Sequence, residues 1–236
     1  MGIIKPSKGK SFDLTISKHA IMIIPKRYVN YIPKRFKTNN LGEIDGCLYR
    51  LYITLNNVAI CGPFLGAPQA VLGLEKLIAL GAKNIWIFSW CGSIKKDIRI
   101  GDIIIPEDAF SDEGTSKHYP ISSKPSFDSN MIRSITNKLK QKNIQFFKGP
   151  LWTTDAPYRE TEDKIKEYQQ KGAIGVDMEI SALMTVSTFR SVSIAGIFVV
   201  SDELFSGKWK PGFSNPLLNE SSQKAIDILI ELSSVL

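Results

Sequence analysis

Two acidic segments contain residues that could take part in catalysis or bind a ligand. In the first, Asp202 follows an apolar run, residues 195–200, and Ser201, so its carboxyl group would lie partly desolvated at the end of a strand. Burial raises the pKa of a carboxyl group, which can then serve as a general acid near neutral pH. The structural alternative makes Ser201 or Asp202 the N-cap of a helix, a position that favours both residue types.

The second segment is Gly175-Val176-Asp177-Met178-Glu179, where the pattern predicts the start of a helix over residues 178–190. Asp177 and Glu179 are two residues apart, so their side chains point in different directions and form no acid/base pair on one helix face. The helix dipole favours acids in a first turn, which explains both without any function. A buried Glu179 could instead accept two hydrogen bonds from a vicinal diol such as ribose.

Two polar loops could also contribute to a site. The loop over residues 111–120 contains His118, and the loop over residues 152–160 contains Tyr158, whose ring could stack on a base. Both patterns are equally typical of solvated surface loops.

The elements that must position these residues follow from hydrophobic periodicity. Strands are expected at residues 21–24, 58–60, 84–88, 102–105 and 195–200, and helices at residues 68–80, 130–142, 162–171, 178–190 and 221–236. This alternation predicts an α/β sandwich with a largely parallel central sheet, built as one domain from residues 1–236. In such folds ligands bind outside the carboxyl ends of the strands, where Asp202 would lie.

Composition limits the classes of protein further. The chain has 236 residues, 43% of them apolar, which suits a globular domain with its own core. Three scattered cysteines and the lack of a signal-peptide pattern predict a cytoplasmic protein. The longest apolar stretch, residues 194–200, is too short to span a bilayer. The two histidines have no ligand spacing, so no metal site is expected.

The net charge of +7 is unevenly distributed. Residues 1–40 hold nine Lys and Arg against one acid, a net of +8, whereas residues 41–236 hold 21 against 22, a net of −1. The excess therefore belongs to the N-terminal part of the chain, which includes a basic extension over residues 1–19. Such a segment is more commonly solvated or in contact with another subunit than bound to DNA or RNA, so no nucleic-acid partner is expected.

Four motifs, taken in order, resemble the nucleoside phosphorylase/nucleosidase superfamily, which includes purine and uridine phosphorylases. The resemblance runs over about residues 20–235 and rests on residues 91–93, 100–106 and 112–119 together with the pair Val176-Asp177-Met178-Glu179 and Val199-Val200-Ser201-Asp202. It implies a three-layer α/β/α fold around a mixed sheet that curls towards a barrel. It also implies a homo-oligomer, from dimer to hexamer.

The same resemblance implies an enzyme that cleaves the N-glycosidic bond of a nucleoside. Glu179 would bind the ribose hydroxyls and Met178 would pack on the sugar. Asp202 would protonate or hydrogen-bond the departing base, Ser201 would position it, and Tyr158 would stack on the base. An acid near the base and a carboxylate near the sugar serve the two charges that develop when this bond breaks.

The chain departs from this family where phosphorylases bind phosphate. The Gly-Asp-Pro loop after the first strand is absent, and Lys26 and Arg27 stand in its place. Ile87 and Trp90 occupy the positions of a phosphate-binding Arg and of a Ser or Thr. An Ile cannot bind phosphate, and a Trp fills volume that the anion needs.

Three interpretations follow, and no cofactor is required by any of them. In the first, phosphorolysis gives free base and ribose 1-phosphate, with inorganic phosphate as co-substrate bound by Lys26 or Arg27. In the second, water replaces phosphate, although no acid stands between Asp13 and Glu43 to activate it. In the third, the protein binds a nucleoside without cleaving it. In the family that the chain resembles, an Asp after the Val-Val-Ser run is the purine-type arrangement, whereas the loop over residues 112–119 resembles the uridine phosphorylase branch. The resemblance therefore favours a purine only slightly over a pyrimidine.

Overall fold

The computed structural model of the protein describes residues 3–7, 16–36, 38–44 and 49–235. Most of the predicted N-terminal extension, residues 1–2 and 8–15, lies outside these residues, as does Cys47. The side chains of residues 38–44 are also outside the description.

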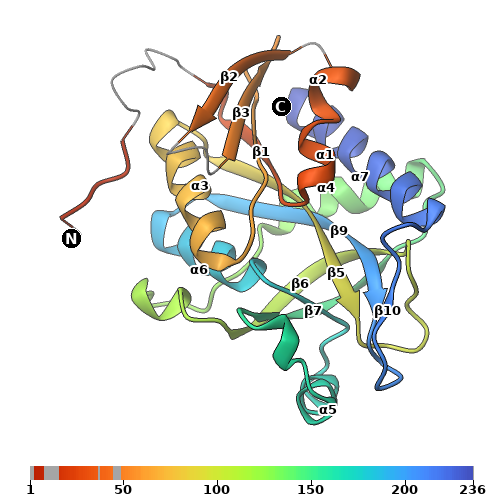
Figure 1. Ribbon diagram of the computed structural model, residues 1–236. Coiled ribbons are helices and arrows are strands. Elements are labelled where there is room, and N and C mark those ends of the chain that lie inside the picture. Colours follow the sequence, from red (N-terminus) through yellow and green to blue (C-terminus); the bar gives the residue numbers. More distant parts are fainter. Residues whose placement is uncertain (1–2, 8–15, 37, 45–48, 236) are drawn as a thin grey trace.

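The chain alternates strands and helices from residue 19 onwards (Figure 1). The strands are β1 (His19–Ile23), β2 (Thr38–Ile44), β3 (Tyr49–Thr54), β4 (Ala59–Gly62), β5 (Asn84–Ser93), β6 (Ile103–Asp112), β7 (Phe147–Thr154), β8 (Gly175–Asp177), β9 (Ser193–Glu203) and β10 (Lys210–Pro211). The helices are α1 (Lys26–Val29), α2 (Ile32–Arg35), α3 (Ala67–Leu80), α4 (Ser129–Gln141), α5 (Glu162–Gln170), α6 (Ile180–Arg190) and α7 (Pro216–Val235). Two 3-10 turns, η1 (Ser116–His118) and η2 (Pro157–Arg159), lie in the loops.

The strands form one mixed sheet that closes on itself. Their order is β10-β9-β6-β7-β8-β5-β1-β4-β3-β2, and β9 also pairs with β5. This extra pairing closes β5, β9, β6, β7 and β8 into a barrel, with parallel pairs such as β5–β9 and antiparallel pairs such as β5–β8. Helices α3 and α6 pack together on one side, and α4 and α7 pack together on the other (Figure 1). The predicted three-layer fold with a curled mixed sheet is confirmed. The expectation of a largely parallel sheet is wrong, because antiparallel pairings among the described residues are as numerous as parallel ones.

All five predicted strands exist, but three are longer than predicted. Strands β5, β6 and β9 each continue for three or more residues beyond the apolar run, through polar residues such as Ser89, Ser111 and Asp202. Strands β2, β3, β7, β8 and β10 were not predicted. Pairing with neighbours on both sides stabilises a short or polar strand such as β8, which has only three residues and no periodicity of its own.

All five predicted helices are present. The prediction for residues 178–190 began too early, because Asp177 ends strand β8 and Glu179 is the N-cap of α6. The last helix, α7, begins at Pro216 rather than at residue 221. No helix of the described residues is long and apolar enough to cross a membrane.

Candidate active site

Strand β5 brings the two acidic segments together at Gly92. Gly92 is paired with Val176 of β8 on one side and with Asp202 of β9 on the other. Since neighbouring strands lie about 4.8 Å apart, the backbones of Val176 and Asp202 are separated by about 10 Å. A Cβ atom on residue 92 would lie 2.5 Å from Leu204 Cδ1 and 3.2 Å from Asp202 Oδ2. A larger residue at position 92 would therefore require the Leu204 side chain to move and would crowd the Asp202 carboxyl group.

Glu179 lies at the start of α6 with its carboxyl group buried. Its Oε1 accepts a hydrogen bond of 2.7 Å from the backbone N–H of Gly66, in the loop between β4 and α3. Burial and the charge of Asp177 together raise the pKa of Glu179 to about 8, against the opposing effect of the hydrogen bond from Gly66. The carboxyl group therefore holds a proton at neutral pH until a ligand with hydrogen-bond donors reaches it.

Asp177 has a structural role. Its Oδ2 accepts the backbone N–H groups of Glu179, at 2.9 Å, and of Ile180, at 2.7 Å, and its Oδ1 accepts the hydroxyl of Thr153 at 2.6 Å. It thus satisfies the free N–H groups at the start of α6. Burial raises the pKa of Asp177, and these hydrogen bonds oppose that rise. The sequence analysis offered a structural explanation for these acids, namely that an acid is stabilised at the start of a helix. That explanation applies to Asp177.

Asp202 accepts hydrogen bonds on both of its oxygens. The hydroxyl of Ser201 lies 2.6 Å from Oδ1, and the indole Nε1 of Trp209 lies 2.9 Å from Oδ2. Both residues of the Ser201-Asp202 pair lie within β9, so the alternative in which one of them caps a helix is wrong. Ser201 is buried, and its hydroxyl also lies 3.2 Å from the carbonyl oxygen of Cys91 on β5. This contact holds the Ser201-Asp202 pair against β5.

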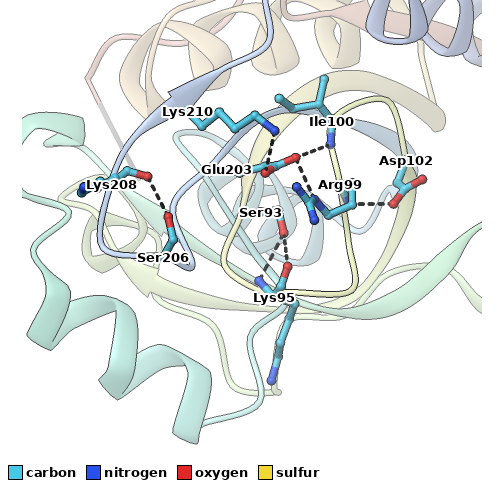
Figure 2. Close-up of polar contacts among 9 residues, drawn as sticks. All are labelled: Ser93, Lys95, Arg99, Ile100, Asp102, Glu203, Ser206, Lys208 and Lys210. Atoms are coloured by element: carbon cyan, nitrogen blue, oxygen red, sulfur yellow. Dashed lines mark hydrogen bonds and ion pairs between the residues drawn. The ribbon is translucent and has the colours of Figure 1, made fainter.

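Glu203, the next residue, differs from Asp202 because its role is purely structural. Figure 2 shows its buried carboxylate between Arg99, at 3.0 Å, the backbone N–H of Ile100, at 3.2 Å, and Lys210, at 3.4 Å. Although burial raises the pKa of Glu203, the hydrogen bonds from these three groups lower it overall. Glu203 ties β9 to the turn before β6 and to β10, and this holds Asp202 in register.

The two polar loops meet beside Glu179. The backbone N–H of Gly114 donates to Asp155 at 2.8 Å, and Glu113 accepts from the hydroxyl of Ser181 on α6 at 3.1 Å. Hydrogen bonds from Ser116, Ser111 and Thr115 lower the pKa of Glu113 despite its partial burial. The charge of Asp155 acts on Glu179. Both loops are thereby brought to the edge of the site.

Other sequence candidates lie less close to the acids. His118 is exposed in η1. The ring of Tyr158 is 99% exposed in η2, so its predicted stacking on a base stays a prediction. Met178 is half-buried between Asp177 and Glu179, at the place where a sugar would contact it.

Glu160 is a site residue that the sequence did not single out. It follows η2 in the loop that carries Tyr158, and its side chain is half-buried. Burial and then the charge of Asp202 raise the pKa of Glu160 to about 7. The signal available in the sequence was weak, because an acid just before the helix at residues 162–171 is adequately explained by the helix dipole.

The carboxyl groups of this region form a six-carboxyl cluster. The charge of one member raises the pKa of another, as Asp202 does for Glu160 and Asp177 does for Glu179. The charges of Asp177 and Asp202 both raise the pKa of Cys91. The cluster consists of Glu113, Asp155, Glu160, Asp177, Glu179 and Asp202. Among the described residues no group of three or more His, Cys, Asp or Glu side chains has the arrangement of a metal site.

Aromatic side chains fill the region around Trp90. The rings of Tyr28 and Phe213 lie 5.7 Å and 5.9 Å from that of Trp90, and its indole Nε1 donates to the buried hydroxyl of Ser222 at 3.0 Å. Ile87 lies in the core with 1% of its surface exposed. The two residues that replace phosphate ligands, Ile87 and Trp90, are thus both packed against neighbouring side chains.

The basic residues predicted to bind an anion lie on α1, on the same side as Trp90. Arg27 donates from Nη1 to the carbonyl oxygen of Phe213 at 3.1 Å, and lines an open pocket of about 200 Å³ with Lys34 and Asn219. Lys26 is exposed. Their role as anion ligands stays a prediction.

Comparison with known proteins decides the family. The sequence model described as "Phosphorylase superfamily" matches residues 25–232, which is most of the chain. The chain belongs to the phosphorylase superfamily. Members of this superfamily are enzymes, and the motifs quoted from the sequence lie inside the matched region.

Relatives within the superfamily differ in the reaction that their names describe. The chain is 27% identical over 178 residues to a DeoD-type purine nucleoside phosphorylase of Bacillus cereus, covering 74% of this chain and 76% of that one. It is 22% identical over 178 residues to a guanosine phosphorylase of Halorubrum lacusprofundi, covering 75% and 74%.

Two solved structures share the fold. An AMP nucleosidase from Bacteroides thetaiotaomicron matches with a TM-score of 0.74 and 21% identity, covering 93% of this chain and 91% of that one. A purine nucleoside phosphorylase from Toxoplasma gondii matches with a TM-score of 0.79 and 19% identity, covering 93% and 90%.

Proposed function

We propose that this protein cleaves the N-glycosidic bond of a purine nucleoside. The observation that carries the proposal is the placement of Glu179 and Asp202 on the two sides of Gly92. Glu179 follows β8 at the start of α6 and Asp202 lies on β9, a spacing that suits the sugar and the base of one nucleoside. The relatives named as purine-nucleoside and guanosine phosphorylases support the purine.

The residues divide between the two ends of the substrate. At the sugar, Glu179 accepts hydrogen bonds from the ribose hydroxyls and Met178 packs against the ring. At the base, an acid supplies the proton that the departing nitrogen needs, and Ser201 and Trp209 hold Asp202 in place. The ionised carboxyl groups of the six-carboxyl cluster stabilise the positive charge that develops on the sugar as the bond breaks.

Water is the nucleophile that the geometry favours. A phosphate dianion entering beside the ionised carboxyl groups of this cluster would be repelled unless cations balanced it. Ile87 lies in the core and Trp90 is packed between Tyr28 and Phe213, so neither position offers a ligand to an anion. Phosphorolysis remains the second candidate, favoured by the relatives that are phosphorylases and by Lys26 and Arg27 on α1.

The first prediction concerns phosphate. With the full-length protein in a phosphate-free buffer, we expect purine nucleosides to give free base and ribose, at a rate that added phosphate does not change. The products are separated by liquid chromatography and identified by mass. A pyrimidine nucleoside series serves as the specificity control.

Other outcomes each remove one version of the proposal. Base release that requires phosphate and yields ribose 1-phosphate would show phosphorolysis instead of hydrolysis. Nucleoside binding by calorimetry without any base release would show a binding protein. We also expect a homo-oligomer, which light scattering of the same sample tests.

A further inference from the structure

We infer that the open pocket between α1, α2 and α7 is a second binding site, which takes the phosphoryl group of a small phosphate monoester. The inference goes beyond the proposed nucleoside cleavage and does not depend on it. It follows from the lining of the pocket, which presents positive charge and hydrogen-bond donors and includes no acid.

The pocket lies where the two short helices after β1 meet the last helix (Figure 1). The hydroxyl of Tyr28 on α1 donates to Asn219 Oδ1 on α7 at 3.1 Å, and Arg35 at the end of α2 pairs with Asp227 of α7 at 3.3 Å. The volume of the pocket is about 200 Å³. A water molecule takes up about 30 Å³ in the liquid, so the pocket has room for a phosphoryl group with a small group attached to it.

Two cations of the lining have no acidic partner in the described part of the chain. Arg27 donates from Nη1 to the carbonyl oxygen of Phe213 at 3.1 Å, and neither Arg27 nor Lys34 forms an ion pair there. The other N–H groups of Arg27 and the ammonium group of Lys34 are therefore available to a ligand. Their two positive charges balance a phosphate monoester dianion, and a guanidinium group can bind two phosphate oxygens side by side.

The acids closest to these cations along the chain do not neutralise them. On α7, Glu220 pairs with Lys224 at 2.7 Å and Asp227 pairs with Arg35 at 3.3 Å. Residues 16–36, which include α1 and α2, contain no Asp or Glu. The positive charge at the pocket is therefore left for a ligand to balance.

The side-chain amides of the pocket add donors rather than acceptors. Asn30 Oδ1 lies 2.9 Å from Arg50 Nη1, and because Arg has only donors the Asn30 oxygen must face it. The oxygen of Asn219 accepts from Tyr28. The NH₂ groups of Asn30, Asn219 and Gln223 have no acceptor among the described residues, so they can donate to phosphate oxygens.

Two tyrosine rings form the apolar part of the lining. Tyr28 and Tyr31 lie with their ring centroids 6.4 Å apart and their planes at 82°. Carbon atoms bonded to a phosphate oxygen can pack against these rings, whereas inorganic phosphate has no such atoms. This part of the lining therefore favours a monoester over inorganic phosphate.

The pocket is separate from the nucleoside site. None of the six carboxyl groups of that site lines it. A row of ring contacts connects the two regions: the ring of Trp90 lies 5.7 Å from Tyr28 and 5.9 Å from Phe213. The ring of Phe213 lies 6.2 Å from that of Trp209, whose indole donates to Asp202. This path passes through three aromatic side chains, so a phosphoryl group in the pocket is a second ligand and not the group that attacks the sugar.

Calorimetric titration of the full-length protein in a chloride buffer tests the inference, with glycerol 3-phosphate and inorganic phosphate as the probes. We expect glycerol 3-phosphate to bind with a Kd of about 1 mM or lower, and its affinity to fall as the chloride concentration rises. Arg27→Gln and Lys34→Gln should each weaken this binding by about 10-fold or more, because each removes a charge-assisted hydrogen bond.

Lys224→Gln is the matched control. Lys224 is an exposed lysine of α7, one residue beyond Gln223, and its charge is already paired with Glu220. Because it does not line the pocket, its loss should change the affinity for glycerol 3-phosphate by less than about twofold.

Three results would overturn the inference. The first is that glycerol 3-phosphate does not bind, whether or not inorganic phosphate does. The second is binding that is unchanged in both Arg27→Gln and Lys34→Gln. The third is formation of ribose 1-phosphate by the wild type and not by these variants, because the pocket would then hold the attacking phosphate. Base release in phosphate-free buffer tests the proposed function without this pocket, so the two can fail separately.

Discussion

Glu179→Gln is expected to lower kcat/KM by about 100-fold and, at pH 8, to make the protein more stable. The loss of activity follows because Glu179 would no longer accept two charge-assisted hydrogen bonds from the ribose hydroxyls, worth about 3 kcal/mol together. The amide oxygen of Gln still accepts from the N–H of Gly66, so the fold around the site is retained.

The gain in stability follows from the pKa of Glu179, which burial raises to about 8 from an ordinary value of 4.5. A group with a raised acid pKa binds more protons in the folded than in the unfolded state, so stability falls as pH rises from 4.5 to about 8. Gln does not ionise, so the variant does not lose stability in this way as pH rises. We expect the free energy of unfolding of the variant to exceed that of the wild type by about 4 kcal/mol at pH 8, and not at pH 4.

Urea unfolding at both pH values measures this difference, and steady-state kinetics measures the activity. Glu167→Gln is the control: Glu167 is an exposed acid on α5 that pairs with Lys171 at 2.6 Å, so its loss should change neither quantity by more than about 0.5 kcal/mol. Unchanged kcat/KM in Glu179→Gln would remove Glu179 from the ribose site.

Arg190→Ala is expected to destabilise the protein by about 3 kcal/mol. Arg190, at the end of α6, binds Glu75 of α3 through two nitrogens, with Nη2–Oε1 at 2.7 Å and Nε–Oε2 at 2.9 Å. Glu75 is buried, so removing Arg190 leaves a charge without its partner between the two helices. We take the lower end of the usual range, because the Arg190 side chain is 35% exposed.

Chemical denaturation near neutral pH tests this expectation. The double variant Glu75→Met/Arg190→Met should recover most of the lost stability, because an apolar pair of similar volume carries no desolvation penalty. If Arg190→Ala is as stable as the wild type, solvent already reaches Glu75 and the pair contributes nothing. The catalytic pH profile should be unchanged in either variant, since the ion pair contacts none of the six carboxyl groups of the site.

Two polar strands and one strand pairing could not be predicted from local sequence patterns. Strand β8 has three residues and exists because β5 and β7 pair with it on both sides. Strand β7 was missed for a related reason: after Phe147 it continues through Lys148, Gly149 and Pro150 and ends in two threonines, yet Leu151 and Trp152 are fully buried. The barrel closure between β5 and β9 joins segments about a hundred residues apart, and no short window contains it.

By itself, the sequence determined the alternation of strands and helices and the family, and it predicted Glu179 and Asp202 as the carboxylates of the site. It could do so because apolar periodicity and short motifs are local properties of a chain. It also located the departures at Ile87 and Trp90. The tertiary structure decided how the environment of each acid differs: Asp177 caps a helix, Glu203 pairs with cations, and burial together with the charge of Asp202 raises the pKa of Glu160. Proton affinity depends on burial and on neighbouring charges, and both are properties of the folded molecule.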